Sequence, residues 1–139
     1  MGLVKVLHFN SKPIDGVLDP FIPKNHLIRF GYADGVTPRI AVYPSIYWAM
    51  FGIHYKRPGR KLWVNYAIVD EDDLYTPLHR ESPRALISRE KWLLKPTEFH
   101  PLKRIQLIEP AGRVRYNYAM GKSAYLCEYW WFTLITVNK

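Results

Sequence analysis

Short hydrophobic runs, separated by prolines and glycines, make up most of the chain and predict strands more than helices. The runs are rich in β-branched and aromatic residues, which favour strands. Strands are expected at residues 4–9, 39–43, 62–69, 91–94, 104–108 and 124–137. Pro96, Pro101 and Pro110 are expected to keep the later strands apart, because proline cannot donate to a strand ladder.

One helix is predicted after Pro44. Hydrophobic side chains recur there at the spacing of one helical face, at Ile46, Ala49, Met50 and Ile53. Ser45 is the expected N-cap, because its hydroxyl oxygen accepts a bond from an N–H group of the first turn. The preceding stretch 10–38 contains four prolines and is expected to be a long ordered surface loop, of the kind that often binds ligands.

These elements predict a single α+β domain over residues 1–139, with mostly antiparallel strands, one short helix and a long N-terminal loop. The hydrophobic content of 48% is enough for a core. No apolar run approaches the roughly 20 residues of a membrane span, and the first residues lack the features of a signal peptide. A cytoplasmic protein is therefore expected. Its single cysteine, Cys127, excludes an internal disulfide and favours a buried, inert thiol.

The charge of the chain predicts an anionic partner. Lys and Arg number 20 against 12 Asp and Glu, which gives a formal net charge of +8. Aromatic residues make up 15% of the chain, more than a core of this size needs. A nucleotide, a nucleic acid and an acidic protein all fit this composition.

Nucleic acid is the weaker of these expectations. Basic residues cluster at Lys56, Arg57, Arg60 and Lys61, and Arg113 and Arg115 lie beside Tyr116 and Tyr118, a combination that suits phosphate neutralisation and base stacking. No helix-turn-helix, zinc finger or RNP signature accompanies them, and an acidic block at 70–73 follows the first cluster. The pattern is more typical of the solvated end of a hairpin.

The start of the predicted helix is a candidate phosphate site. N–H groups at Ser45 and the positive end of the helix dipole attract anions, and Arg39 adds a guanidinium nearby. Tyr43 or Tyr47 is expected to stack on a base. The alternative is an ordinary capped helix beside a surface arginine.

Three polar residues interrupt apolar strands and form a second candidate site. His8, Asn65 and Glu128 are costly to bury unless they pair or face a cleft. If their strands are neighbours, these side chains converge and suit the hydroxyl groups of a ribose. The alternative is a structural His8 with its own hydrogen bonds and a Glu128 on an exposed sheet face.

No metal or cofactor is expected. The histidines, His8, His26, His54, His79 and His100, show neither i, i+4 pairing nor a metalloprotease motif. The aromatic run at 129–132 is most simply a packed central strand, because consecutive strand residues point to opposite faces. An oligomer interface or a stacking platform is the functional alternative for that run.

Several segments resemble a group of small, poorly characterised bacteriophage proteins. The likeness rests on Pro23-Lys24-Asn25, on the stretch 31–40 with its T-x-R-I pattern, on Ser45-Ile46 and on residues 90–96. The resemblance implies a viral origin, and with it the host cytoplasm, and it implies no established activity.

A fainter resemblance is to the ADP-ribosyltransferase fold. His8 in the first strand and Glu128 in the last match the places that hold and orient the nicotinamide-side ribose in that fold, and Tyr43 before the helix resembles its tyrosine strand. Phe9-Asn10 stands where the fold usually has Gly-Ser or Gly-Thr. This combination implies a retained nucleotide pocket without catalysis.

The sequence thus predicts a phage-encoded protein that sequesters a nucleotide-derived host immune signal of ADP-ribose type, with no catalytic residue. Arg39 and Ser45 would hold phosphate, Tyr43 or Tyr47 the base, and His8, Asn10 and Glu128 the ribose. One alternative is a related enzyme acting on NAD, in which Glu128 orients the ribose. Another is an inhibitor that binds a host defence protein through basic and aromatic side chains.

Overall fold

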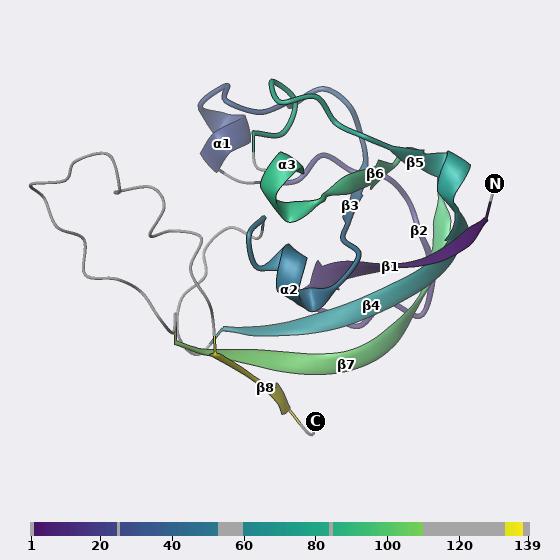
Figure 1. Ribbon diagram of the computed structural model, residues 1–139, viewed down its shortest axis with the longest axis vertical. Helices are drawn as coiled ribbons and strands as arrows, with labels where there is room; N and C mark the ends of the chain where they lie inside the picture. The colour runs from purple at the N-terminus through teal and green to yellow at the C-terminus, as the bar shows by residue number, and fades with distance from the viewer. Residues whose placement is uncertain (1, 25, 53–59, 84, 110–132, 138–139) are drawn as a thin grey trace, which may run out of the picture.

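A computed structural model of the chain describes residues 2–24, 26–52, 60–83, 85–109 and 133–137. These residues form two antiparallel sheets (Figure 1). The main sheet has the order β1-β4-β7-β2, with β8 also paired to β7, and the small sheet has the order β3-β6-β5. The main sheet contains β1 (Leu3–Asn10), β2 (Gly16–Leu18), β4 (Lys61–Asp70), β7 (Thr97–Glu109) and β8 (Thr133–Val137). The small sheet contains β3 (Ile40–Val42), β5 (Leu74–Tyr75) and β6 (Lys91–Leu93).

The predicted α+β class with mostly antiparallel strands is confirmed. The strands predicted at 4–9, 39–43, 62–69 and 91–94 agree with β1, β3, β4 and β6 within one residue at each end. The strand predicted at 124–137 overlaps β8, and residues 124–132 lie outside the described part of the chain. The long loop predicted at 10–38 is partly wrong, because it contains β2 and a helical turn.

The helices are single turns. They are α1 (His26–Arg29), α2 (Ile46–Ala49), α3 (Ala85–Ser88) and the 3-10 turn η1 (Glu71–Asp73). The predicted helix is α2, and the sequence missed α1 and α3 because four residues are too few to establish a periodicity. No helix in the described part of the chain has the length and apolar character that a membrane span requires.

The prediction that proline separates the later strands is wrong at Pro101. β7 continues through this residue, which pairs with Asn65 of β4. The register shifts there, because Val64 pairs with Lys103 and the intervening Leu102 is left out of the ladder. Such a bulge accommodates proline, because the ladder needs no N–H group at that position.

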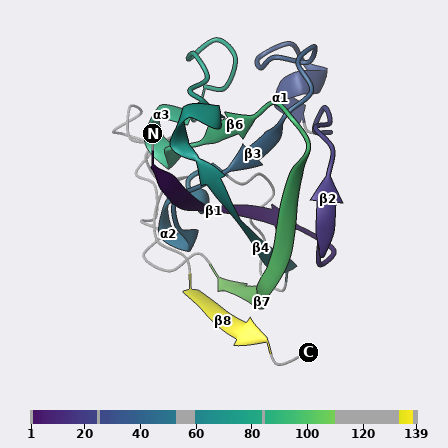
Figure 2. The same cartoon turned by 90° about the vertical axis from the view of Figure 1, so that its right-hand side faces the viewer.

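Strand β3 lies over the main sheet and is tied to it on two sides (Figures 1 and 2). Before β3, Arg39 exchanges two backbone hydrogen bonds with Phe21 in the segment that follows β2, at 3.1 and 2.9 Å. After β3, Tyr43 exchanges two with Leu7 of β1, both of 2.8 Å. The two sheets are therefore joined through backbone contacts at the two ends of β3.

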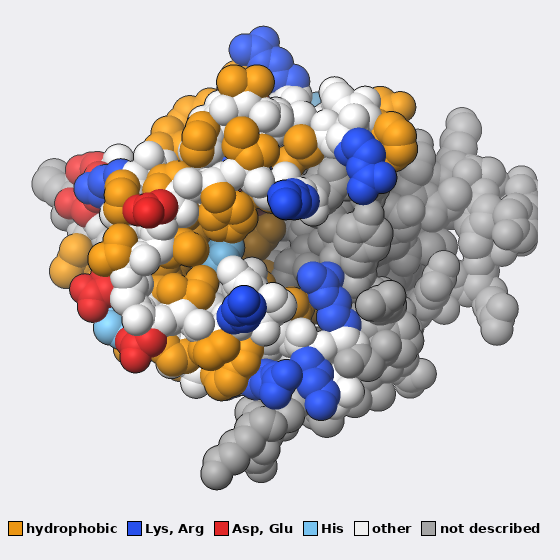
Figure 3. Space-filling model, turned by 180° about the vertical axis from the view of Figure 1, so that it is seen from behind, with side chains coloured by type: hydrophobic (Ala, Val, Ile, Leu, Met, Phe, Trp, Pro, Cys, Tyr) orange, Lys and Arg blue, Asp and Glu red, His pale blue; other side chains and the backbone are white. Residues whose placement is uncertain are grey.

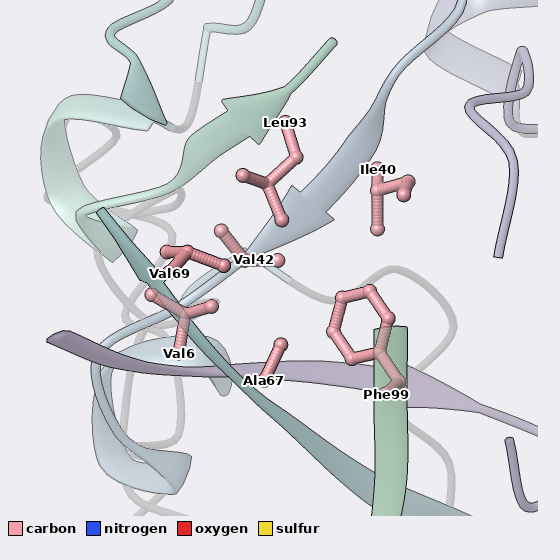
Figure 4. Close-up of a cluster of buried hydrophobic side chains, with 7 residues drawn as sticks. All are labelled: Val6, Ile40, Val42, Ala67, Val69, Leu93 and Phe99. Carbon is pink, nitrogen blue, oxygen red and sulfur yellow. The ribbon is translucent and has the colours of Figure 1, made fainter. Parts of the chain in front are cut away.

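The hydrophobic core lies between the sheets. Seven buried side chains from five strands meet there (Figure 4): Val6, Ile40, Val42, Ala67, Val69, Leu93 and Phe99. A second cluster lies on the other face of the main sheet, beneath α2: Leu7, Tyr43, Ala49, Met50, Leu62, Val64 and Ile105. Consecutive strand residues point to opposite faces, so β1 contributes Val6 to one cluster and Leu7 to the other.

We expect Phe99→Ala to lower the free energy of unfolding by about 3–5 kcal/mol, because the side chain is fully buried and leaves a cavity between the sheets. Urea unfolding followed by fluorescence measures this loss. Val17→Ala, on the paired strand β2 at 68% exposure, is the control and should change stability by less than about 0.5 kcal/mol. Equal losses in both variants would contradict the assignment of the core.

Candidate functional site

His8 is buried within the fold, with only 6% of its surface exposed. Its Nδ1 lies 2.8 Å from the carbonyl oxygen of Ala41, which can only accept, so Nδ1 carries the proton and Nε2 is a hydrogen-bond acceptor. Nε2 is itself buried and has no hydrogen-bond partner among the described residues. The rings of Phe21 and Phe99 lie 6.0 and 5.7 Å from the imidazole.

Burial also fixes the charge of His8. Removal from water lowers the pKa of the imidazole, and the hydrogen bond to Ala41 raises it by a smaller amount. The side chain is therefore neutral at neutral pH. A neutral imidazole with Nδ1 protonated presents one lone pair at Nε2, which suits an O–H or N–H donor.

Asn65 lies directly opposite His8 on β4, so the predicted proximity of these two residues is confirmed. The amide is fully buried, and its oxygen accepts a 2.8 Å hydrogen bond from the N–H of Ile14. Its nitrogen donates to the carbonyl oxygens of His8 and Lys12, both at 3.5 Å. Asn65 therefore holds the segment after β1 against the sheet, a structural role.

The next row on the same face of the main sheet contains Asn10, Trp63 and Arg104, which are cross-strand neighbours. Asn10 is half-buried, and its side-chain oxygen accepts from the N–H of Lys12 at 3.3 Å. The Nε atom of Arg104 is buried without a hydrogen-bond partner in the described part of the chain. We call these two rows, His8 and Asn65 with Asn10, Trp63 and Arg104, the polar face.

The surface shows where the basic side chains gather. In the view of Figure 3, Lys and Arg side chains border a hollow near the middle of the molecule, and hydrophobic side chains lie within it. The Asp and Glu side chains visible in this view gather along one edge, away from the hollow. This separation of charge, together with a formal net charge of +8, favours an anionic ligand on this side of the molecule.

Arg39 does not join this site. It precedes Ile40, which points into the core between the sheets, so the Arg39 side chain lies on the opposite face of the small sheet. Only 4% of it is exposed, and its guanidinium lies 4.3 Å from the ring of Trp92. One guanidinium nitrogen donates to the carbonyl oxygens of Asp34 and Thr37, at 2.7 and 3.0 Å. Arg39, predicted to hold phosphate, is instead an internal brace for the turn at 34–38, and the alternative of a surface arginine is wrong as well.

Tyr43 is likewise an internal residue, because 7% of it is exposed and its hydroxyl donates to Glu90 at 3.5 Å. Glu90 is buried and also accepts from Ser82 at 3.2 Å and from the indole of Trp92 at 2.6 Å. Burial raises the pKa of Glu90, while these hydrogen bonds and the charge of Arg39 lower it by less. Glu90 was not among the site residues predicted from the sequence, although a carboxylate directly before an apolar strand indicates a buried, hydrogen-bonded acid.

The remaining predicted site residues lie elsewhere. Ser45 is confirmed as the N-cap of α2, and its hydroxyl accepts from the N–H of Trp48 at 3.3 Å. One helical turn sums few peptide dipoles, so it attracts anions weakly. Tyr47 is 52% exposed, so of the two tyrosines predicted to stack on a base, Tyr43 and Tyr47, it is the exposed one. Glu128 lies outside the described residues.

The predicted residues thus divide between separate places. His8 and Asn10 share the polar face with Asn65, whereas Arg39 lies on the far side of β3 and Tyr43 belongs to the second hydrophobic cluster. Comparison with protein-family models, with curated proteins and with solved structures finds no match to this chain. The likenesses to phage proteins and to the ADP-ribosyltransferase fold therefore stay predictions from sequence.

We expect the protein to lose stability as the pH falls below 6.5, the ordinary pKa of histidine, because the unfolded chain then binds a proton that buried His8 does not. The stability contributed by neutral His8 is fully present above pH 6.5. Below that pH, the free energy of unfolding falls by up to about 1.4 kcal/mol per pH unit. Urea unfolding at several pH values between 7.5 and 5 measures it. His8→Gln should flatten the slope.

Two points make this measurement specific for His8. The raised pKa of Glu90 has the opposite effect, because the stability that it contributes is lost as the pH rises above 4.5. This effect is the same in the unmodified protein and in His8→Gln. His79→Gln makes the same substitution at an exposed histidine and is the control for the change of residue type. Parallel slopes for the unmodified protein and His8→Gln would contradict a neutral buried His8.

Proposed function

We propose that this chain binds a small anionic ligand with sugar hydroxyl groups, of the nucleotide class, on the polar face, and that it sequesters the ligand unchanged. The observation that carries the proposal is the buried Nε2 of His8, an acceptor without a hydrogen-bond partner among the described residues. An unsatisfied buried polar atom costs about 1–3 kcal/mol, so a folded protein keeps one where something else satisfies it.

The chemistry of His8 selects a hydroxyl or amino group. The proton on Nδ1 is committed to Ala41, and the lowered pKa keeps the ring from taking a second proton at neutral pH. Nε2 therefore accepts and does not donate. A ribose hydroxyl supplies the donor, and the adjacent, exposed ring of Phe21 provides an apolar contact for the sugar carbons.

The cation at Arg104 supports a phosphate at the other end of the ligand. Its Nε is a buried donor without a hydrogen-bond partner in the described residues, on the same face as His8. The two side chains lie on adjacent rows, roughly 7 Å apart along the strands, and two strands apart across the sheet. The charged donor of Arg104, at this separation from the acceptor Nε2 of His8, fits a phosphorylated sugar better than a compound with hydroxyl groups alone.

An ADP-ribose-type immune signal of an infected host belongs to this class of ligand and is the specific candidate that we propose. A phage-encoded binder of such a signal needs tight binding and no turnover. The enzyme alternative assigns ribose orientation to Glu128, which lies outside the described residues, so it depends on the sequence alone.

We expect the protein to bind ADP-ribose, NAD or a related signalling nucleotide and to release it intact. Isothermal titration measures binding, and mass spectrometry after heat denaturation identifies the released compound. Intact ligand supports sequestration, whereas cleaved or transferred ADP-ribose supports the enzyme. Failure of every nucleotide in the panel to bind at low salt would overturn the proposal.

We expect Arg104→Met to weaken binding roughly tenfold or more, because it removes a charged hydrogen bond worth about 1.5–3 kcal/mol and keeps much of the side-chain volume. Lys103→Met is the matched control. Lys103 directly precedes Arg104 in β7, is exposed, and lies on the other face of the sheet. Calorimetry on both variants separates a specific contact from general charge. Equal weakening by the two substitutions would argue against the polar face.

A further inference from the structure

An exposed aromatic cluster lies on α2 and the turn after it. The ring of Tyr47 lies 5.1 Å from that of Trp48 and 5.3 Å from that of Phe51, and both pairs meet edge to face. Trp48 and Phe51 are half-buried, and Tyr47 is 52% exposed. The guanidinium of Arg89, the residue directly after α3, lies 4.0 Å from the centre of the Trp48 ring. We call Tyr47, Trp48, Phe51 and Arg89 the aromatic platform.

The backbone of Arg89 is strained. Its φ angle is 57°, in the left-handed region, and it is the one residue other than glycine with a positive φ in the described part of the chain. Helices commonly end in this conformation with glycine, because a side chain adds steric strain there. An arginine at this position retains the strain and places a cation over the half-buried ring of Trp48.

The platform is held in place from beneath. A Cβ atom at Gly52 would lie 2.9 Å from atoms of Ser88 and Tyr43, so the chain after α2 packs directly against the end of α3. Ser45 caps the other end of α2 through its bond to Trp48. Four aromatic and basic side chains on two packed turns therefore form a rigid surface, and rigid stacking surfaces lose little entropy on binding.

We infer that the aromatic platform is a second binding site, and that it takes single-stranded nucleic acid. Every base has a π-face, which suits the exposed ring of Tyr47, and Arg89 provides a planar cation for the neighbouring phosphate. The net charge of +8 complements a polyanion. Bases of a duplex are already stacked inside it, so a single strand is the form that an exposed ring can bind.

The platform is separate from the polar face. Figure 2 shows α2 and α3 on the side of the molecule away from β2, and the segment that follows β2 is the one that contacts His8 through Phe21. The two proposals therefore stand or fall independently. The exposed Leu86 of α3, at 87% exposure, is the feature that a protein partner would use instead.

Fluorescence anisotropy with a labelled oligo-dT of 15 nucleotides tests the inference at two salt concentrations. We expect Tyr47→Ala to weaken binding roughly five- to a hundredfold, the range for loss of one stacked base. Arg89→Gly should weaken binding as well and reduce the salt dependence, while its Tm stays equal or rises by about 2–4 °C because the left-handed strain is relieved. A lower affinity in a protein that is no less stable is the signature of a functional residue.

The chain offers matched controls on α1 and the residues after it. Tyr32 is 66% exposed and Arg29 is exposed, so Tyr32→Ala and Arg29→Gly remove the same groups elsewhere and should leave affinity within about twofold. Loss of binding in the controls equal to that in the platform variants would overturn the inference. So would displacement of the oligonucleotide by poly-glutamate at the same charge concentration, or absence of binding at low salt.

Discussion

The hydrogen bond between His8 Nδ1 and the Ala41 carbonyl is the contact on which the arrangement of this protein depends. Strand β3 has only three residues and a ladder on one side, with β6. Its attachment to the main sheet comes from backbone bonds at its two ends and from His8 at its middle. Ile40 and Val42 of β3 are completely buried. They pack between the sheets only if β3 keeps its position over the main sheet.

Strand β3 also separates two buried polar groups. On the core side, His8 and Asn65 lie on the face of the main sheet that is turned toward β3, and on the other side Arg39 and Glu90 lie within one network around Trp92. The charge of each of these two groups favours the charged form of the other, and Arg39 braces the turn at 34–38 through its bonds to Asp34 and Thr37. The charge of Arg39 is therefore used inside the fold, so in the proposed complex the phosphate is bound by residues of the main sheet such as Arg104.

Strands were predictable from the sequence because each is a short run of β-branched and aromatic residues between turn signals. The path of β7 was not, since it passes through Pro101 by means of a bulge that depends on its partner β4. His8 and Asn65 were recognisable as polar residues in apolar strands, and their pairing needed only adjacency of β1 and β4. Arg39 and Tyr43 were misplaced because alternation along β3 assigns them to the face opposite the core that lies between the sheets. The sequence does not show that this face is covered by other segments, such as the turn that Arg39 braces.

The position of His8 has a consequence for how binding and stability are related. One nitrogen of the ring holds β3 in place and the other is the proposed acceptor for the ligand, so any substitution changes both. Arg104 is half-buried and has no such second role in the described contacts. In the proposed complex, a donor bonded to Nε2 selects the neutral tautomer with its proton on Nδ1, and this is the tautomer that donates to Ala41. Binding of the proposed ligand to the folded protein would then also strengthen the attachment of β3, through the same side chain.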